Sequence, residues 1–234
     1  MGRLSKIFKT IDWRYSLGEL FLIVSGILIA LALNQWNEKR KIYDRETEML
    51  KELKVSLEND MEDILINLNV HNQSYDSAIL LLDHLKSKRS YNDTLDPHFG
   101  KVLGTTIFLT DDAAYNNLQD TGRHLVTNNS IRAKLSKLYA HDYKFIAALE
   151  EIDSQNLLLH LKPYYTRHFK NFSLFKNAEP RNYDFLIEDP EYISQLEWIR
   201  DNRMFTVYRY KTIKDKVENI IDMLDEELRD RSRP

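Results

Sequence analysis

The pattern of apolar and polar positions changes sharply along the first forty residues of the chain. Leu20–Leu33 (LFLIVSGILIALAL) is an apolar stretch without any charge. Extended from Tyr15 to Trp36 it has about 22 residues, which as a helix is long enough for a hydrocarbon core. Trp13, Tyr15 and Trp36 flank it as the aromatic belts of membrane helices do. The pattern therefore predicts a transmembrane helix over residues 15–36.

Two other interpretations of this segment stay open. Ala30-Leu31-Ala32 is an A-x-A pattern that a signal peptidase could cleave. A buried helix of a soluble protein has a similar composition. We expect a retained signal-anchor, because the polar sequence after Trp36 continues directly as a helix.

A long amphipathic pattern follows from Glu38 to Lys88, where neither Pro nor Gly occurs. Its apolar positions lie three, four or seven residues apart, the spacing of a coiled-coil-like seam. They are Leu50, Leu53, Leu57, Met61, Ile64, Leu68, Tyr75, Ile79, Leu82 and Leu85. His71 fills the one gap in this seam. We expect it to be a core histidine, with a ligand or pH-sensing role as the alternative.

Helix-start and helix-stop signals divide the rest of the chain. Asp96-Pro97, Thr110-Asp111-Asp112, Asn128–Ser130 and Asp189-Pro190 resemble N-terminal caps, and Gly122 resembles a helix stop. The helix after Asn128 is expected to use one apolar face, made of Leu135, Leu138, Tyr139, Phe145, Leu149, Ile152 and Leu159. The last helix is expected to run to about Arg229, with a face made of Ile213, Val217, Ile220, Leu224 and Leu228.

Few strand signals interrupt this helical pattern. Val102–Leu109 is expected to be a loop or a helix end, and residues 171–189 an ordered loop. Pro163 should kink or end its helix. The sequence therefore predicts an all-α fold, in which one N-terminal transmembrane helix continues into an antiparallel bundle of long helices. The expected organisation is a basic tail (1–14), the span (15–36), the bundle (37–230) and a frayed tail (231–234).

Composition narrows the classes of function. The chain has 234 residues, of which only 6 are Gly and 5 are Pro, as expected for long helices. It has 0 Cys, which excludes disulfides, Cys-ligated metals and a Cys nucleophile. The net charge of −3 gives no reason to expect a nucleic acid as partner.

The cations concentrate near the apolar segment. Residues 1–45 hold 8 Lys and Arg against 4 Asp and Glu. The short tail before the span carries four cations, and a larger number follow the span, so counting alone favours a cytoplasmic bundle. Because long domains translocate largely regardless of charge, we expect the tail inside and the bundle in the periplasm, anchored in the inner (cytoplasmic) membrane.

Three groups of residues are candidate membrane contacts. Glu19, Gly26 and Ala30 share one helical face, on which the two small residues permit close helix approach and Glu19 could join a helix contact or a proton relay. The alternative is a Glu19 that reaches headgroup water. Lys39, Arg40 and Lys41, with the flanking aromatic residues, are expected at the headgroups.

A ligand pocket in the bundle is a weaker hypothesis. Tyr115 and Arg123 flank the helix end at Gly122, where backbone N–H groups and Arg132 could meet an anion. Tyr164 and Tyr165 belong to an aromatic cluster that could form a groove. For both sets the alternative is ordinary core packing. The histidines form no metal-binding motif, and no nucleotide or hydrolase motif occurs, so we expect no cofactor, no metal and no enzymatic activity.

Two motifs resemble those of an uncharacterised family of small single-pass membrane proteins common in Bacteroidota. GELFLIVSGILIALALNQWNEKR is similar to its N-terminal signature, except that Ala32 and Gln35 stand where Gln and Asn are usual. YNNLQDTG and the helix after it are similar to its second motif through Tyr115, Leu118, Thr121, Gly122, Ile131, Leu135 and Tyr139. The resemblance implies a membrane protein, and because the family's function is unknown it assigns no activity.

These observations predict a membrane-anchored, non-enzymatic binding or scaffold protein. Its expected partners are the lipid bilayer and an unidentified protein, with a second copy of the chain as a further candidate. The alternatives are an extracytoplasmic sensory domain that signals through a separate protein, and a subunit of a membrane complex that uses Glu19.

Overall fold

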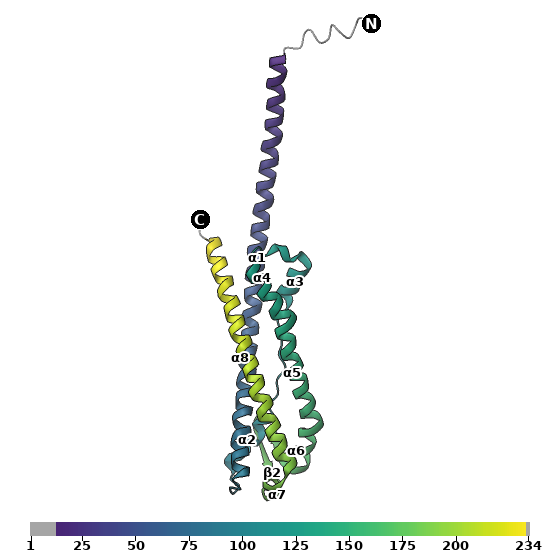
Figure 1. The fold of residues 1–234 in the computed structure, drawn as a ribbon, viewed down its shortest axis with the longest axis vertical. Helices are drawn as coiled ribbons and strands as arrows, with labels where there is room; N and C mark the ends of the chain where they lie inside the picture. The colour runs from purple at the N-terminus through teal and green to yellow at the C-terminus, as the bar shows by residue number, and fades with distance from the viewer. Residues whose placement is uncertain (1–12, 233–234) are drawn as a thin grey trace, which may run out of the picture. The chain divides into compact units, whose positions relative to one another are not determined.

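The computed structural model describes the backbone of residues 13–232 and the side chains of residues 17–232 (Figure 1). The expected aromatic flank Trp13 and Tyr15, and the whole basic tail, lie outside the described side chains. The chain forms two compact units, Met1–Glu48 and Met49–Pro234. Helix α1 (Trp13–Lys86) runs through both units without a break, as the absence of Gly and Pro from Glu38 to Lys88 predicts.

The second unit is almost entirely helical, which confirms the all-α prediction. After α1, its elements are η2 (Asp93–Leu95), α2 (Asp96–Lys101), α3 (Ala113–Thr121), η3 (Arg123–Leu125), α4 (Asn129–Lys137), η4 (Leu138–Asp142), α5 (Tyr143–Asn156), η5 (Leu157–Leu161), α6 (Lys162–His168), β1 (Phe169–Ser173), β2 (Asn177–Pro180), α7 (Tyr183–Glu188) and α8 (Pro190–Ser232). Helix α8 thus includes Arg231 and Ser232, which were expected in a tail.

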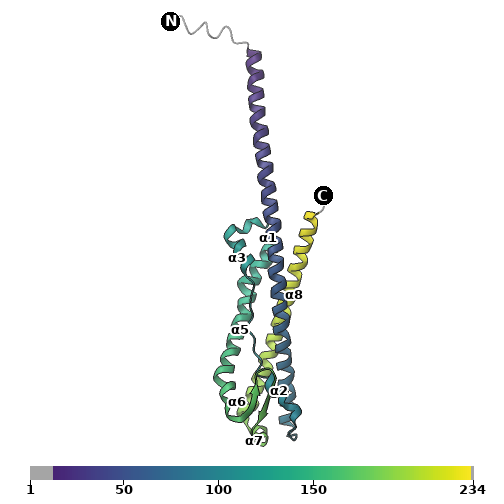
Figure 2. The ribbon, with the colours of Figure 1, turned by 180° about the vertical axis from the view of Figure 1, so that it is seen from behind.

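Within this unit α8 runs antiparallel to α1 (Figures 1 and 2). Lys54 bonds to Asp225, Asn67 to Tyr210, and Lys86 to Glu197, so rising numbers on α1 meet falling numbers on α8. This arrangement confirms the predicted antiparallel pairing of long helices.

Local sequence sets several helix ends, although α2 begins at Asp96 with Leu95 as its N-cap, so Asp96 does not cap it as predicted. The Asn128 side chain accepts hydrogen bonds from the backbone N–H groups of Ser130 and Ile131 at the start of α4. Gly122 ends α3 with a φ of 109°, a conformation that favours glycine. Asp189 accepts from the N–H of Glu191 at the start of α8. These three predicted caps are confirmed.

Beyond Tyr139 the apolar face predicted for the helix after Asn128 is wrong except at Leu149, which packs against the first apolar core. Phe145, Ile152 and Leu159 are 37%, 54% and 67% exposed. The buried side chains of this helix after Tyr139 are Asp142, Tyr143, Ile146, Glu150, Asp153 and Leu161. The cause is that η4 and η5 are π-helical turns, each of which inserts an extra residue and rotates the following helix.

Pro163 does not end its helix, because η5 lies directly before it. The wider π-helical turn accommodates the proline, and α6 continues to His168. On α1 the predicted seam holds except near its end, where Ile79 is 41% exposed and Ala78 is buried instead.

The expected loop at 171–189 is instead a β-hairpin and a helix. Strands β1 and β2 pair antiparallel, with Phe169 opposite Pro180, and α7 follows. The strands are short and carry little β-branched sequence, so the local pattern did not reveal them. Burial of Phe169 and Ala178 in the core holds the hairpin in place. Val102–Leu109 adopts no regular strand, as expected.

The second unit contains two separate apolar cores. The first surrounds Leu53, Leu135 and Val217, and the second surrounds Leu82, Tyr165 and Leu196. Along α1 the first ends at Ile64 and the second begins at Ala78. The residues between them are therefore the place to look for chemistry.

Candidate functional site

A layer of buried polar side chains separates the two apolar cores. Helix α1 contributes Asn67, His71 and Ser74, α5 contributes Glu150 and Asp153, and α8 contributes Arg203 and Thr206. All seven are at most 5% exposed. Burial of charged groups is costly unless each is paired, so the contacts of this layer decide its role.

Glu150 is bonded on both carboxylate oxygens. Its Oε1 accepts from the hydroxyls of Thr106 and Tyr210, each at 2.6 Å, and its Oε2 accepts from the backbone N–H of Phe108 at 2.6 Å. Burial tends to raise the pKa of Glu150, but the nearby His71 ring and these hydrogen bonds outweigh it and hold the pKa below its ordinary value. Glu150 is therefore a buried carboxylate ion.

Arg203 and Asp153 form the second half of the layer. The guanidinium Nη1 lies 2.5 Å from Oδ2 of Asp153, Nη2 donates to the carbonyl of Gly104 at 2.7 Å, and Nε donates to Ser74. Asn202 donates to the other Asp153 oxygen at 3.2 Å. Each charge thus faces its counterpart inside the protein.

His71 lies at the edge of this network. Its Nε2 is 2.8 Å from the Thr106 hydroxyl and 3.9 Å from Glu150, while its buried Nδ1 has no hydrogen-bond partner among the described residues. Burial lowers the pKa of His71 below its usual range, so the ring is neutral near pH 7. It is a core histidine, as the sequence suggested first.

Glu150 and Arg203 of this layer, together with two carboxylates outside it, bind one extended segment, Gly104–Asp112, which we call the strap. Among the residues that the structure describes, no β-strand pairs with the backbone of the strap. Asp60 accepts from the N–H of Asp111 at 2.7 Å, Asp63 from that of Leu109 at 3.1 Å, and Glu150 from that of Phe108. These carboxylates supply the acceptors that a second strand would otherwise provide. The layer is accordingly a structural support.

The π-helical turn η4 is the more promising feature, since such turns occur often at functional sites. It joins α4 to α5, and its last hydrogen bond runs from the N–H of Tyr143 to the carbonyl of Leu138. Leu138 and Asp142 point to one side of the turn and line a cavity against α8. Tyr139 and Ala140 line a groove elsewhere on the turn.

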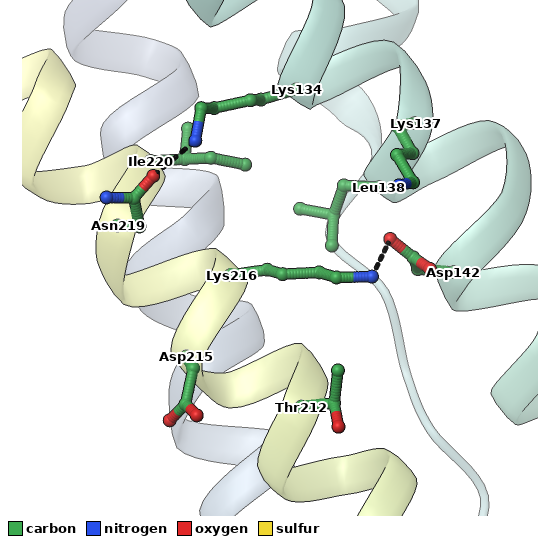
Figure 3. A pocket seen from close by; sticks show the side chains of 9 residues that line it. All are labelled: Lys134, Lys137, Leu138, Asp142, Thr212, Asp215, Lys216, Asn219 and Ile220. Atoms are coloured by element: carbon green, nitrogen blue, oxygen red, sulfur yellow. Dashed lines mark hydrogen bonds and ion pairs between the residues drawn. The ribbon is translucent and has the colours of Figure 1, made fainter.

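The cavity beside α8 has a volume of about 450 Å³ (Figure 3). Figure 3 shows Lys134 and Lys137 reaching it from the α4 side and Lys216 crossing from α8. Leu138 and Ile220 are its buried apolar members. Thr212, Asp215 and Asn219 complete the α8 wall.

Asp142 is the electrostatic centre of this cavity. Its side chain is 3% exposed, and Oδ2 lies 2.7 Å from the Lys216 ammonium. His141 Nδ1 is 3.3 Å and Arg209 4.0 Å from its other oxygen. Burial tends to raise the pKa of Asp142, but the hydrogen bonds from Lys216 and His141 outweigh it and hold the pKa below its ordinary value.

The groove contains two of the residues that the sequence singled out. Tyr115 and Arg123 line it together with Tyr139 and Lys144, and its volume is about 500 Å³. Tyr115 stacks on Tyr139 with ring centroids 4.3 Å apart. Arg123 is bonded to Gln119 at 2.6 Å. Arg132, the other suggested anion ligand, instead donates to the carbonyl of Val126 at 2.5 Å.

Tyr164 and Tyr165 do not join Tyr115 and Arg123. Both are fully buried in the second apolar core, where the Tyr165 hydroxyl donates to the carbonyl of Phe99 at 2.9 Å and the Tyr164 hydroxyl to Asp189. Tyr164 also stacks on Tyr192 with centroids 5.2 Å apart. Their surroundings therefore match ordinary core packing, which was the alternative interpretation of these two residues.

The candidate membrane residues lie in the first unit. Glu19, Gly26 and Ala30 are exposed, and a Cβ atom added at Gly26 would meet nothing within 4 Å. Trp36 is 61% exposed, and the Arg40 guanidinium lies 5.9 Å from its ring centroid. Lys41 pairs with Glu38 at 3.0 Å, and Lys39 is exposed.

Sequence reasoning missed Lys134, Lys137 and Lys216. The i, i+3 spacing of the two lysines on α4 was a visible signal of a shared face. Nothing in the sequence pairs that face with Lys216. Within residues 17–232, no group of three or more His, Cys, Asp or Glu side chains is arranged to hold a metal ion.

The fold and these sites define a class: an all-α protein with one helix long and apolar enough to cross a membrane, and with a helical bundle hollowed beside a π-helical turn. More particularly, the chain belongs to a family of unknown function, DUF6090, whose model matches residues 19–196. The match includes both motifs that carried the resemblance, apart from Gly18. No curated protein and no solved structure matches the chain.

Proposed function

We propose that this protein is a membrane-anchored, non-enzymatic binding protein whose helical bundle carries the binding site. One observation carries the anchoring. The apolar window in α1 has a mean hydropathy of 2.1, and none of it is buried by the described protein.

The side chains of this window support a lipid environment. Phe21 and Leu22 are 70% and 72% exposed, and Leu28 is 61% exposed. An uninterrupted apolar surface of this kind is unfavourable in water and requires another apolar phase to cover it. A core helix of a soluble protein would instead be buried by its own fold. The exposure therefore favours a span or a signal segment.

The flank of the window favours a retained anchor. The amphipathic ring of Trp36 lies beside the Arg40 guanidinium, and Lys39 and Lys41 add further cations, as in interfacial segments. Beyond it, α1 continues into the second unit, where Leu50 and Leu53 are completely buried. A signal peptide that is cleaved off would not need to continue as one helix into the folded part of the protein.

The test of anchoring combines extraction with labelling. Full-length protein should remain in the membrane fraction after alkaline carbonate and enter solution only with detergent. Intact mass should include the residues before Ala30. Release by carbonate, or a soluble product beginning near Asn34, would contradict retained anchoring.

Orientation is tested in a chain that has no native cysteine. Ser90→Cys lies at an exposed position after α1, and Ser5→Cys lies before the apolar segment. With the bundle in the periplasm, a membrane-impermeant maleimide should label Ser90→Cys in intact cells and Ser5→Cys only after lysis. The reverse pattern would place the bundle in the cytoplasm and overturn the proposed periplasmic location.

Self-association through the span is part of the proposal. Glu19, Gly26 and Ala30 lie on one helical face, because Gly26 follows Glu19 by seven positions and Ala30 follows it by eleven. Gly26→Leu should reduce cross-linked dimer in membranes, because it removes the close-approach surface. Val24→Leu, on a different face, is the matched control. Equal dimer yields from both variants would exclude this face.

A sensory role is the second candidate, favoured by the continuity of α1 from the apolar window into the bundle. A sensor requires that ligand binding in the bundle alter α1. The measurement is hydrogen exchange of amides 37–48 in full-length protein in detergent, with and without inorganic phosphate, a probe chosen for the lysines in Figure 3. If hydrogen exchange of these amides is unchanged at saturating phosphate, the sensory role is contradicted.

A further inference from the structure

We propose that the cavity between η4 and α8 binds the phosphate group of a phosphate monoester, through the ammonium groups of Lys134, Lys137 and Lys216. The inference deepens the proposed binding function and rests on it, but not on the membrane location.

The charges around the cavity leave cations without a carboxylate partner. Lys216 is paired with Asp142. Lys134 donates to the amide oxygen of Asn219 at 2.6 Å, which does not neutralise it. Within residues 17–232, Lys137 has no hydrogen-bond or ion-pair partner. Two positive charges are thus available to an anion.

The two carboxylates of the lining do not remove this excess. Asp142 is already shared by Lys216, His141 and Arg209. Figure 3 shows the Asp215 carboxylate pointing away from the Lys216 ammonium. A ligand in the cavity would therefore meet ammonium groups from two opposing walls.

The type of donor favours phosphate over a carboxylate. Lysine ammonium groups act as point charges that suit a tetrahedral dianion, whereas carboxylates are bound best by the planar fork of arginine. A phosphate monoester carries nearly two negative charges at neutral pH, which matches the two available cations. Lys134 and Lys137 face the cavity from α4 and Lys216 from α8, so a phosphate could be contacted from both walls.

The rest of the cavity suits a small organic substituent. A volume of about 450 Å³ falls within the range of small-molecule sites. Buried Leu138 and Ile220 offer an apolar surface. The π-helical turn supplies both Leu138 and Asp142, so the irregularity of the helix shapes this wall.

The experiment is isothermal titration of full-length protein in a neutral detergent at low ionic strength, with inorganic phosphate and then glycerol phosphate. Lys134→Gln/Lys137→Gln should weaken binding of both by about a hundredfold, since the variant removes two charged hydrogen bonds and each contributes about tenfold. Both lysines are exposed, so the variant should fold.

The matched control is Lys211→Gln/Lys214→Gln. It removes the same charge from the neighbouring surface of α8, outside the cavity lining. Binding within about twofold of the original would support a defined site. No detectable binding by the original protein, or equal weakening by both double variants, would overturn the proposal. Neither result would alter carbonate extraction, so failure of this site is distinguishable from failure of anchoring.

A second arm identifies the source of the phosphate. The full chain in phosphatidylcholine nanodiscs is compared with the chain in nanodiscs containing phosphatidate, whose headgroup is a phosphate monoester. Occupancy by headgroup should reduce later glycerol phosphate binding, and the lysine double variant should abolish that competition. Unchanged glycerol phosphate binding in both nanodiscs would support a soluble ligand, and binding in neither would contradict the site.

Discussion

Arg203 of α8 and Asp153 of α5 form an ion pair of 2.5 Å inside the bundle, with their side chains 1% and 4% exposed. The pair lies between the two apolar cores and ties the middle of α8 to α5. Its guanidinium also holds the carbonyl of Gly104 at the start of the strap. It therefore links three segments that are distant in sequence.

Breaking this pair on one side should be costly. Arg203→Met leaves a buried, uncompensated carboxylate at Asp153, for which a loss of about 3–5 kcal/mol is expected. Asp153→Leu/Arg203→Met should recover much of that loss, because neither charge then remains. The measurement is the free energy of unfolding from denaturant titration in mild detergent. Additive losses in the double variant would contradict a direct pairing.

Loss of Glu150 should loosen the strap locally. Glu150→Ala removes the acceptor of the Phe108 N–H and of the Tyr210 and Thr106 hydroxyls, and buried unsatisfied donors cost about 1–3 kcal/mol each. We expect faster hydrogen exchange at amides 105–111 than elsewhere in the bundle. Glu151→Ala, at an exposed neighbouring position, is the control. Exchange that rises equally throughout the bundle would argue against a local role.

Asp60 should make stability depend on pH between about 4 and 6. Burial raises its pKa from 3.8 to about 6, although hydrogen bonds from Asp111 and Tyr143 oppose the shift. The folded protein therefore binds this proton more tightly than the unfolded chain. Its stabilising contribution is complete below pH 3.8 and is lost as pH rises through about 6.

The variant Asp60→Asn removes this titration while keeping an acceptor for the Asp111 N–H. Its free energy of unfolding relative to the original protein should rise by up to about 3 kcal/mol from pH 4 to pH 7, at about 1.4 kcal/mol per pKa unit. Asp76→Asn, at an exposed site on α1, should show no such trend. A constant difference across this range would show that Asp60 is not perturbed.

Gly100 should resist substitution, because α2 and β2 meet closely there. A Cβ atom at this position would lie 2.6 Å from the carbonyl carbon of Lys176 and closer still to the backbone of Asn177. Gly100→Ala should therefore destabilise the bundle by about 1–3 kcal/mol through overpacking. Gly26→Ala, where the added atom meets nothing within 4 Å, should be neutral. Thermal unfolding of both variants in detergent measures the difference.

Sequence signals predicted the helical elements well where the local structure depends only on neighbouring residues. Asn128, Gly122 and Asp189 act at the helix ends where their side chain or backbone freedom is needed. The apolar spacing of α1 identified Leu50, Leu53 and Leu57 as core. The face of α5 was wrong because periodicity assumes 3.6 residues per turn, and the π-helical turn η4 breaks that assumption.

The candidate site was only partly predictable. Tyr115 and Arg123 do share a groove, because both lie near the end of one short helix. Lys134 and Lys137 could be seen as neighbours, but their meeting with Lys216 depends on how α8 packs against α4. No sequence signal singled out the carboxylates Asp60 and Glu150, because their partners, the backbone N–H groups of Asp111 and Phe108, lie more than forty residues away in the chain.

By itself, the sequence determined the helical class, several helix ends and the apolar window, because capping, backbone freedom and hydropathy act over a few neighbouring residues. Only the tertiary structure decided the buried polar layer, the hairpin, the rotated face of α5 and the lysine-lined cavity. The polar layer and the cavity depend on groups that are far apart in the chain and meet only when the helices pack. The hairpin and the π-helical turn are local in sequence, but neither leaves a signal in the apolar periodicity, and the hairpin is held by burial of Phe169 and Ala178 in the core.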